Sequence, residues 1–80
     1  MNTMSDNKFI IDIGKTIAHL RKIHNLSQED LAELSDTHRT YLSEVEGGKR
    51  NPTITVLKKM VDSFGISMSS FFKLVEEKND

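Results

Sequence analysis

The sequence predicts an all-α fold, a compact bundle of five short helices. Apolar residues recur at steps of three and four in successive segments, which is the spacing of one helical face. Glycine, proline and capping residues separate these segments, and no segment shows the alternation of a half-buried strand. The 80 residues have room for one domain, which we expect at residues 8–77, with polar, frayed ends at residues 1–7 and 78–80.

The first helix is expected over residues 8–24. Its apolar stripe is formed by Ile10, Ile13, Ile17 and Leu20. Gly14 lies inside this helix and costs it about 1 kcal/mol relative to alanine. A close approach of another helix to this position would account for the glycine.

The second helix has the clearest start signal in the chain. Ser27 is placed to cap it, and Asp30, three residues further on, can complete a capping box. Leu26 and Leu31 occupy the two positions of a hydrophobic staple on either side of the cap. We expect this helix to end near Ser35, after about two turns.

A third short helix is expected over residues 38–46, with Thr37 as its cap and two glycines directly after it. A helix of this length is not held in place by its own hydrogen bonds. Leu42 and Val45 therefore have to pack on a core behind it.

Two further helices complete the predicted bundle. The fourth begins at Thr53, has Gly65 as its C′ residue, and has an apolar stripe that comprises Ile54, Leu57, Val61 and Phe64. Ser67 caps the fifth, which presents an apolar side that comprises Met68, Phe71, Phe72 and Val75.

The second and third helices have the spacing of a helix-turn-helix, whose second helix enters the DNA major groove. The outer face of that helix carries polar side chains suited to base edges: His38, Arg39, Thr40, Ser43 and Glu44. Arg39 can donate two hydrogen bonds to guanine O6 and N7. Glu44 can accept from cytosine N4 or hold Arg39 in position.

Phosphate contacts are expected on either side of this reading helix. The start of the second helix offers unpaired N–H groups and the side-chain amide of Gln28, which suit an anion. The loop after the third helix offers a second set, Lys49, Arg50 and Asn51. These contacts would position the protein without specifying a base sequence.

Composition restricts the other function classes. The net charge of −1 at pH 7 is low for a nucleic-acid binder, so a basic surface has to be local. Cysteine is absent, and His19 and His24 lie five residues apart, a poor spacing for metal ligands, so no metal or other cofactor is expected. No nucleophile and base stand at a workable spacing, so we reject an enzyme. No apolar run spans a membrane, and a cytoplasmic location is expected.

The fifth helix has more apolar side chains than one face requires. Phe71 is expected to serve the core, and Phe72, Leu74 and Val75 to form a symmetric dimer interface. The alternative is that Phe72 folds back onto the first or fourth helix. A two-fold dimer implies two reading helices about 34 Å apart and a palindromic operator.

Several segments resemble the Cro/C1-type, or Xre-type, helix-turn-helix family. They are LSQEDLA at residues 26–32, YLS at 41–43, VEGGKRNP at 45–52 and FGIS at 64–67, and the resemblance covers residues 10–75. Within the family, HRTYLS at residues 38–43 is similar to the reading helix of restriction–modification controller proteins. Two departures occur at the turn, where Asp36 replaces the usual glycine and Thr37 a larger aliphatic residue. Asp36 tolerates a left-handed backbone better than most residues, so the turn is expected to form.

This resemblance implies a lambda-repressor-like five-helix fold, with Gln28 on a phosphate and the polar face of the reading helix in the groove. It implies a homodimeric transcriptional regulator, bacterial or phage-encoded, that binds double-stranded DNA at an inverted-repeat operator. RNA polymerase is a further partner where the protein activates transcription. The controller of a restriction–modification operon is the role that fits best. A phage or plasmid repressor of the same fold, or an antitoxin that binds a toxin protein, is the alternative.

Overall fold

The computed structural model describes residues 3–78, which form five α-helices and no strand. The helices are α1 Thr3–Ile23, α2 Gln28–Leu34, α3 Arg39–Glu46, α4 Ile54–Asp62 and α5 Met68–Lys78. The predicted all-α fold with five helices is therefore confirmed. None of the helices in residues 3–78 combines the length and the apolar character that a bilayer crossing needs.

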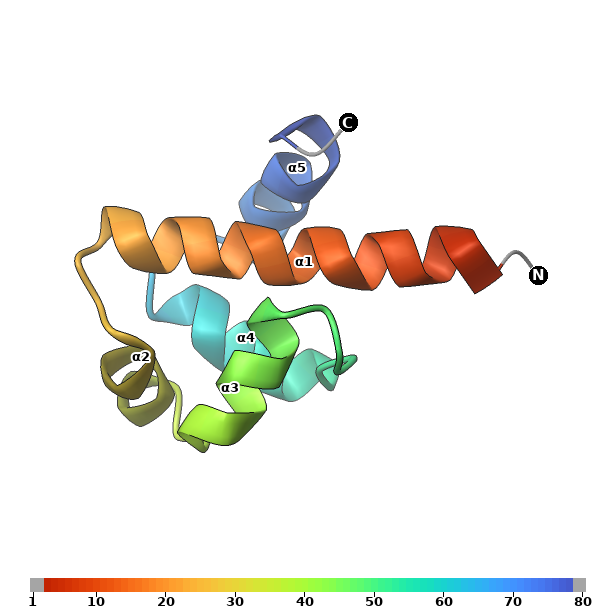
Figure 1. Cartoon of the computed structure of the whole chain (residues 1–80). Helices are drawn as coiled ribbons and strands as arrows, with labels where there is room; N and C mark the ends of the chain where they lie inside the picture. Colours follow the sequence, from red (N-terminus) through yellow and green to blue (C-terminus); the bar gives the residue numbers. More distant parts are fainter. Residues whose placement is uncertain (1–2, 79–80) are drawn as a thin grey trace.

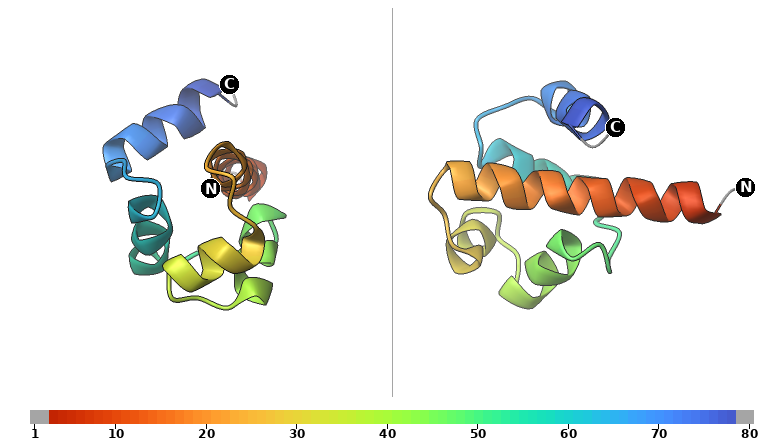
Figure 2. Two further views of the ribbon diagram at one scale, coloured as in Figure 1. Left: turned by 90° about the vertical axis from the view of Figure 1, so that its left-hand side faces the viewer. Right: turned by 45° about the horizontal axis from the view of Figure 1, so that its top comes forward.

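The long helix α1 runs through the middle of the molecule, as Figure 1 shows. In Figure 1, α2, α3 and α4 lie below α1 and α5 lies above it, and the right-hand view of Figure 2 again has α2 and α3 on the side of α1 opposite to α5. α1 packs against α3 and α5, α2 packs against α3 and α4, and α4 packs against α5. The helix-turn-helix pair and the last helix therefore occupy opposite sides of α1.

One apolar core joins all five helices. Its buried side chains are Ile13, Ile17, Leu20, Leu31, Ala32, Leu42, Val45, Leu57, Met60, Val61, Phe64, Phe71 and Val75. The predicted inward positions of Leu42 and Val45 are confirmed, since both side chains are fully buried. The prediction that Ile54 faces the core is wrong: its side chain is 65% exposed, because it is the first residue of α4 and lies beyond the edge of the core.

The ends of the helices differ from the prediction at both termini. α1 begins at Thr3, so residues 3–7 are part of a helix, and α5 includes Lys78 as its last residue. Residues 3–7 contain no proline or glycine, so nothing in the sequence ends the helix there. The rest of the expectation concerns residues 1–2 and 79–80, which lie outside the described residues.

The close helix approach expected at Gly14 is confirmed, and the approaching helix is α3. A Cβ atom at Gly14 would overlap the carbonyl oxygen of Val45 and lie 2.9 Å from that of Glu46. Both are backbone atoms in the last turn of α3, so no side-chain rotation could relieve the contact. The absence of a side chain at Gly14 thus determines how closely α3 lies against α1.

Candidate nucleic-acid interface

The first part of the helix-turn-helix begins with the predicted capping box. The Ser27 hydroxyl accepts a hydrogen bond from the Asp30 N–H at 3.0 Å, and the Asp30 carboxylate accepts one from the Ser27 N–H at 2.9 Å. The pKa of the Asp30 carboxyl is lowered, because hydrogen bonding favours its charged form. The hydrogen bond from the Ser27 backbone N–H has the larger effect, and hydrogen bonding with the Ser27 side chain the smaller one. The first turn of α2 is therefore fixed by local contacts.

The turn between α2 and α3 has the predicted left-handed residue, Asp36, with a φ of 55°. The prediction that Thr37 caps α3 is wrong. The N-cap is His38, whose backbone is extended at φ −85° and ψ 145° and whose side chain makes no capping hydrogen bond. The helix thus begins one residue later than predicted, and the Thr37 hydroxyl lies 3.1 Å from that of Ser35 instead.

The predicted reading face of α3 is open to solvent. His38, Arg39, Thr40 and Ser43 are exposed and Glu44 is half-exposed, whereas Leu42 and Val45 on the opposite side are fully buried. Within residues 3–78, Arg39 has no hydrogen bond or ion pair, so its guanidinium is available to a ligand. The helix therefore presents its polar side outward while its apolar side holds it on the core.

Glu44 is paired with Arg50 and not, as one of the predictions had it, with Arg39. The Arg50 Nε donates to the Glu44 Oε1 at 2.8 Å, and the Arg50 guanidinium carbon lies 4.9 Å from the centroid of the Tyr41 ring. The Tyr41 hydroxyl accepts a hydrogen bond from the Thr53 N–H at 3.3 Å. The loop that follows α3 therefore packs on the outer side of the reading helix through contacts with Glu44 and Tyr41.

This loop brings the predicted phosphate residues Lys49, Arg50 and Asn51 together, and all three are exposed. Gly48 begins the loop with a φ of 73°, a conformation that side chains disfavour. A Cβ atom there would also lie 2.7 Å from the Ile11 Cγ1 of α1. The path of the cationic loop thus depends on a glycine at its first position.

The side chain of Gln28, predicted to touch a phosphate, is part of a network that joins three helices. Its Nε2 donates to the Glu46 Oε1 at 3.0 Å, which leaves one of its two N–H donors for another acceptor. Glu46 also accepts from the Nε of Arg21 at 2.7 Å and from its Nη2 at 3.0 Å.

The ion pair at the centre of this network is largely shielded, with 12% of the Arg21 side chain and 7% of the Glu46 side chain exposed. The hydrogen bond with Glu46 raises the pKa of Arg21 because it favours the charged guanidinium. Arg21 and Glu46 were not predicted from the sequence. They lie 25 residues apart, and no local pattern links positions at that separation.

The dimer residues predicted on α5 divide into three cases. Val75 is only 2% exposed and belongs to the core, so its assignment to an interface is wrong. Phe72 is half-buried and stacks on Phe9 of α1 at 6.1 Å between ring centroids, which is the alternative that the sequence left open. Leu74 is 36% exposed and borders a groove of about 350 Å³ between α1 and α5, lined by His19, Leu20, Ile23, Leu74 and Glu77.

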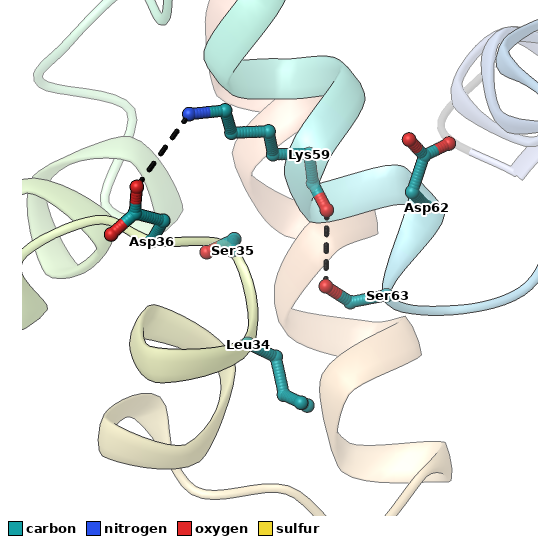
Figure 3. A pocket seen from close by; sticks show the side chains of 6 residues that line it. All are labelled: Leu34, Ser35, Asp36, Lys59, Asp62 and Ser63. Carbon is teal, nitrogen blue, oxygen red and sulfur yellow. Dashed lines mark hydrogen bonds and ion pairs between the residues drawn. The ribbon is translucent and has the colours of Figure 1, made fainter.

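A cavity of about 310 Å³ lies between the α2–α3 turn and α4 (Figure 3), lined by Leu34, Ser35, Asp36, Lys59, Asp62 and Ser63. Lys59 lies 3.8 Å from the Asp36 carboxylate, and the Ser63 hydroxyl donates to the Lys59 carbonyl at 3.0 Å (Figure 3). These polar groups contact one another and do not converge on the cavity. No three histidine or acidic side chains in residues 3–78 come together as metal ligands.

Known proteins are similar to this chain in sequence and in fold. A profile of the helix-turn-helix family matches residues 17–71. The control protein C.MunI of Mycoplasma sp is 38% identical over 73 residues, which are 90% of this chain and 99% of that protein. The HTH-type transcriptional regulator PuuR of Escherichia coli (strain K12) is 34% identical over 67 residues, and this chain spans only 36% of its length.

Among solved structures, the chain is similar to the restriction-modification controller protein C.Esp1396I, crystallised as a tetramer in complex with its natural 35 base-pair operator. The TM-score is 0.81 at 30% identity, and the match covers 89% of this chain and 93% of that one. The family match spans the α2–α3 pair and the residues on either side of it. The chain therefore belongs to the helix-turn-helix family.

Proposed function

We propose that the protein is a sequence-specific DNA-binding transcriptional regulator that reads the major groove with α3. The observation that carries this proposal is the solvent-open polar face of α3, held on the core by the fully buried Leu42 and Val45. C.MunI is a control protein, PuuR is a transcriptional regulator, and C.Esp1396I is bound to its operator, which supports the same role here. We infer a binding role without a catalytic step, and a DNA ligand supports a location in the bacterial cytoplasm.

We assign two kinds of DNA contact to the surface around α3. Base reading belongs to the exposed side chains at its N-terminal end and along its outer face, namely His38, Arg39, Thr40 and Ser43. Phosphate contacts belong to the residues on either side, namely Gln28, Lys49, Arg50 and Asn51. Arg39 is the main base reader, because its unpaired guanidinium can make two hydrogen bonds to guanine.

We further infer that the protein is the controller of a restriction–modification system and acts as a homodimer on an inverted repeat. The similarity to C.MunI covers 99% of that control protein, whereas PuuR is far longer than the matching region. Leu74 and Ile23 supply exposed apolar surface for self-association, with 36% and 59% exposure beside the groove between α1 and α5. We propose this surface as the dimer interface in place of the predicted one, which included Val75.

Selection of bound duplexes from a random pool, followed by sequencing, tests both parts of the proposal. We expect an inverted repeat whose half-sites are about one helical turn apart, 10–10.5 base pairs, or a multiple of that spacing. A selected pool no different from the starting pool would overturn sequence-specific DNA binding. A single half-site without its inverted copy would leave DNA binding intact and overturn the homodimer.

A further inference from the structure

An ion pair lies directly on the proposed reading surface. It joins Glu44, on the outer face of α3, to Arg50, in the loop that carries the proposed phosphate contacts. Both side chains are reachable by a ligand, with 41% of Glu44 and 48% of Arg50 exposed. An unpaired carboxylate here would be repelled by DNA phosphates, so its pairing bears on how DNA is bound.

The geometry of the pair leaves most of the guanidinium available. Arg50 donates to Glu44 through Nε, which is one of its five N–H donors. Within the described residues, neither of its terminal nitrogens makes a hydrogen bond. The guanidinium also lies over the Tyr41 ring at 4.9 Å, and the Tyr41 hydroxyl is held by the Thr53 N–H. The planar guanidinium of Arg50 is thus held by Glu44 at Nε and by the Tyr41 ring on one face, and its two terminal nitrogens remain open.

The pair also disfavours a direct role of Glu44 in base reading. Cytosine would offer the carboxylate a neutral amine, whereas Arg50 offers it a charged donor at 2.8 Å. Hydrogen bonds to charged donors are about twice as strong as those between neutral groups. Arg50 is therefore the favoured partner of Glu44 in the DNA-bound protein as well.

We propose that Glu44 is a positioning residue that holds Arg50 across Tyr41, so that the two terminal nitrogens of Arg50 meet an acceptor on DNA. Glu44 itself reads no base. This inference rests on the proposed function and refines its site. It gives Glu44, which the sequence placed among the base readers, a role that acts through another residue.

Glu44→Gln removes the negative charge of this side chain and keeps its length and one acceptor oxygen. Arg50 is then held less firmly toward the acceptor that the docked operator presents, which a scrambled duplex does not place there. Preference for the selected operator over a scrambled duplex should therefore fall about two- to fivefold, as for loss of an exposed ion pair. Arg50 also becomes an uncompensated cation. The slope of log K against log salt should therefore steepen by up to about 0.9.

A double-mutant cycle shows whether Glu44 acts through Arg50. Wild type, Glu44→Gln, Arg50→Ala and the double variant are titrated with the selected operator and a scrambled duplex at several low salt concentrations. We expect Glu44→Gln to change preference when Arg50 is present and not when Arg50 is absent. In the Arg50→Ala background it should raise affinity for both duplexes alike, because it removes an unpaired carboxylate that the phosphates repel. Asp62→Asn is the matched control, because it removes a similarly exposed carboxylate paired with Lys58 at 2.8 Å on α4. Circular dichroism and thermal melting verify that each variant is folded.

The outcomes are distinct. A changed base preference on Glu44→Gln in the Arg50→Ala background would mean that Glu44 reads a base directly, and would overturn the inference. Unchanged preference and slope on Glu44→Gln with Arg50 present would also overturn it, because the pair would then have no role in DNA binding. Failure of the wild type to bind any duplex would overturn the proposed function itself.

Discussion

Replacement of Gly14 by alanine tests the crossing of α1 and α3, on which the placement of the reading helix depends. The added Cβ would overlap the Val45 carbonyl oxygen and lie 2.9 Å from the Glu46 carbonyl oxygen. Both obstacles belong to the backbone of the last turn of α3. Relief therefore requires the two helices to move apart, which disturbs the packing of the fully buried Leu42 and Val45.

Two opposing effects determine the size of the change in unfolding free energy. Alanine favours the helical state of α1 by about 1 kcal/mol relative to glycine. Overpacking of a dense interface costs about 1–3 kcal/mol, and the backbone obstacles at Gly14 place this case at or above the upper end. We expect a net loss of about 2 kcal/mol, which lowers the melting temperature of a domain of this size by about 8–16 °C.

Urea unfolding followed by far-ultraviolet circular dichroism measures this loss. Gly47→Ala is the matched control, because Gly47 has a right-handed backbone with a φ of −80° and its nearest obstacle lies at 3.3 Å. We expect the control to change the unfolding free energy by no more than about 0.5 kcal/mol. If Gly14→Ala proved as stable as the wild type or the control, the close approach of α1 and α3 would be refuted.

Three further predictions concern pH, salt and self-association. The pKa of Asp30 is lowered in the folded state, so its contribution to stability is present above the unfolded-state pKa and is lost as the pH falls through the folded-state pKa. Urea midpoints of Asp30→Asn should therefore fall less on acidification than those of the wild type, and parallel profiles would contradict this. Lys49→Ala should weaken binding to all duplexes alike and flatten the salt slope by about one, and a change in base preference would refute a phosphate role. Leu74→Glu should shift the protein toward a monomer in sedimentation velocity with its helicity retained, and an unchanged dimer would place the interface elsewhere.

Features that depend on neighbouring residues were predictable from the sequence. The capping box of Ser27 and Asp30 needs only residues within one helical turn. Asp36 stands where the resembling family usually has glycine, which indicated a left-handed backbone, and the glycine in the interior of a helix suggested a close approach at Gly14. In each case the chain itself supplies the physical cause.

Features that depend on how the helices pack were not predictable in the same way. The apolar stripe that begins with Ile54 indicates a helical face but not where the core ends, and Ile54 lies beyond it. The crowded apolar residues of α5 suggested a dimer interface. Phe9, however, comes from a part of α1 that was expected at the margin of the domain, and it covers Phe72, while Val75 is taken up by the core.

The candidate site shows the same division. Periodicity separates the buried Leu42 and Val45 from the exposed polar side of α3, so the proposed base readers could be named from sequence spacing. The partner of Glu44 could not be named in this way, because the position of Arg50 depends on how the loop folds back over Tyr41.

Chemical protection of guanine N7 tests most directly the claim that the outer face of α3 reads the major groove. Dimethyl sulfate modifies this atom, which is also the atom that Arg39 is proposed to contact. We predict that the wild type protects a guanine in each half-site of the selected operator. Arg39→Ala, compared at equal occupancy, should lose that protection and about 1–3 kcal/mol of binding free energy. Protection that persists in Arg39→Ala, or a wild type that protects no duplex, would contradict the account.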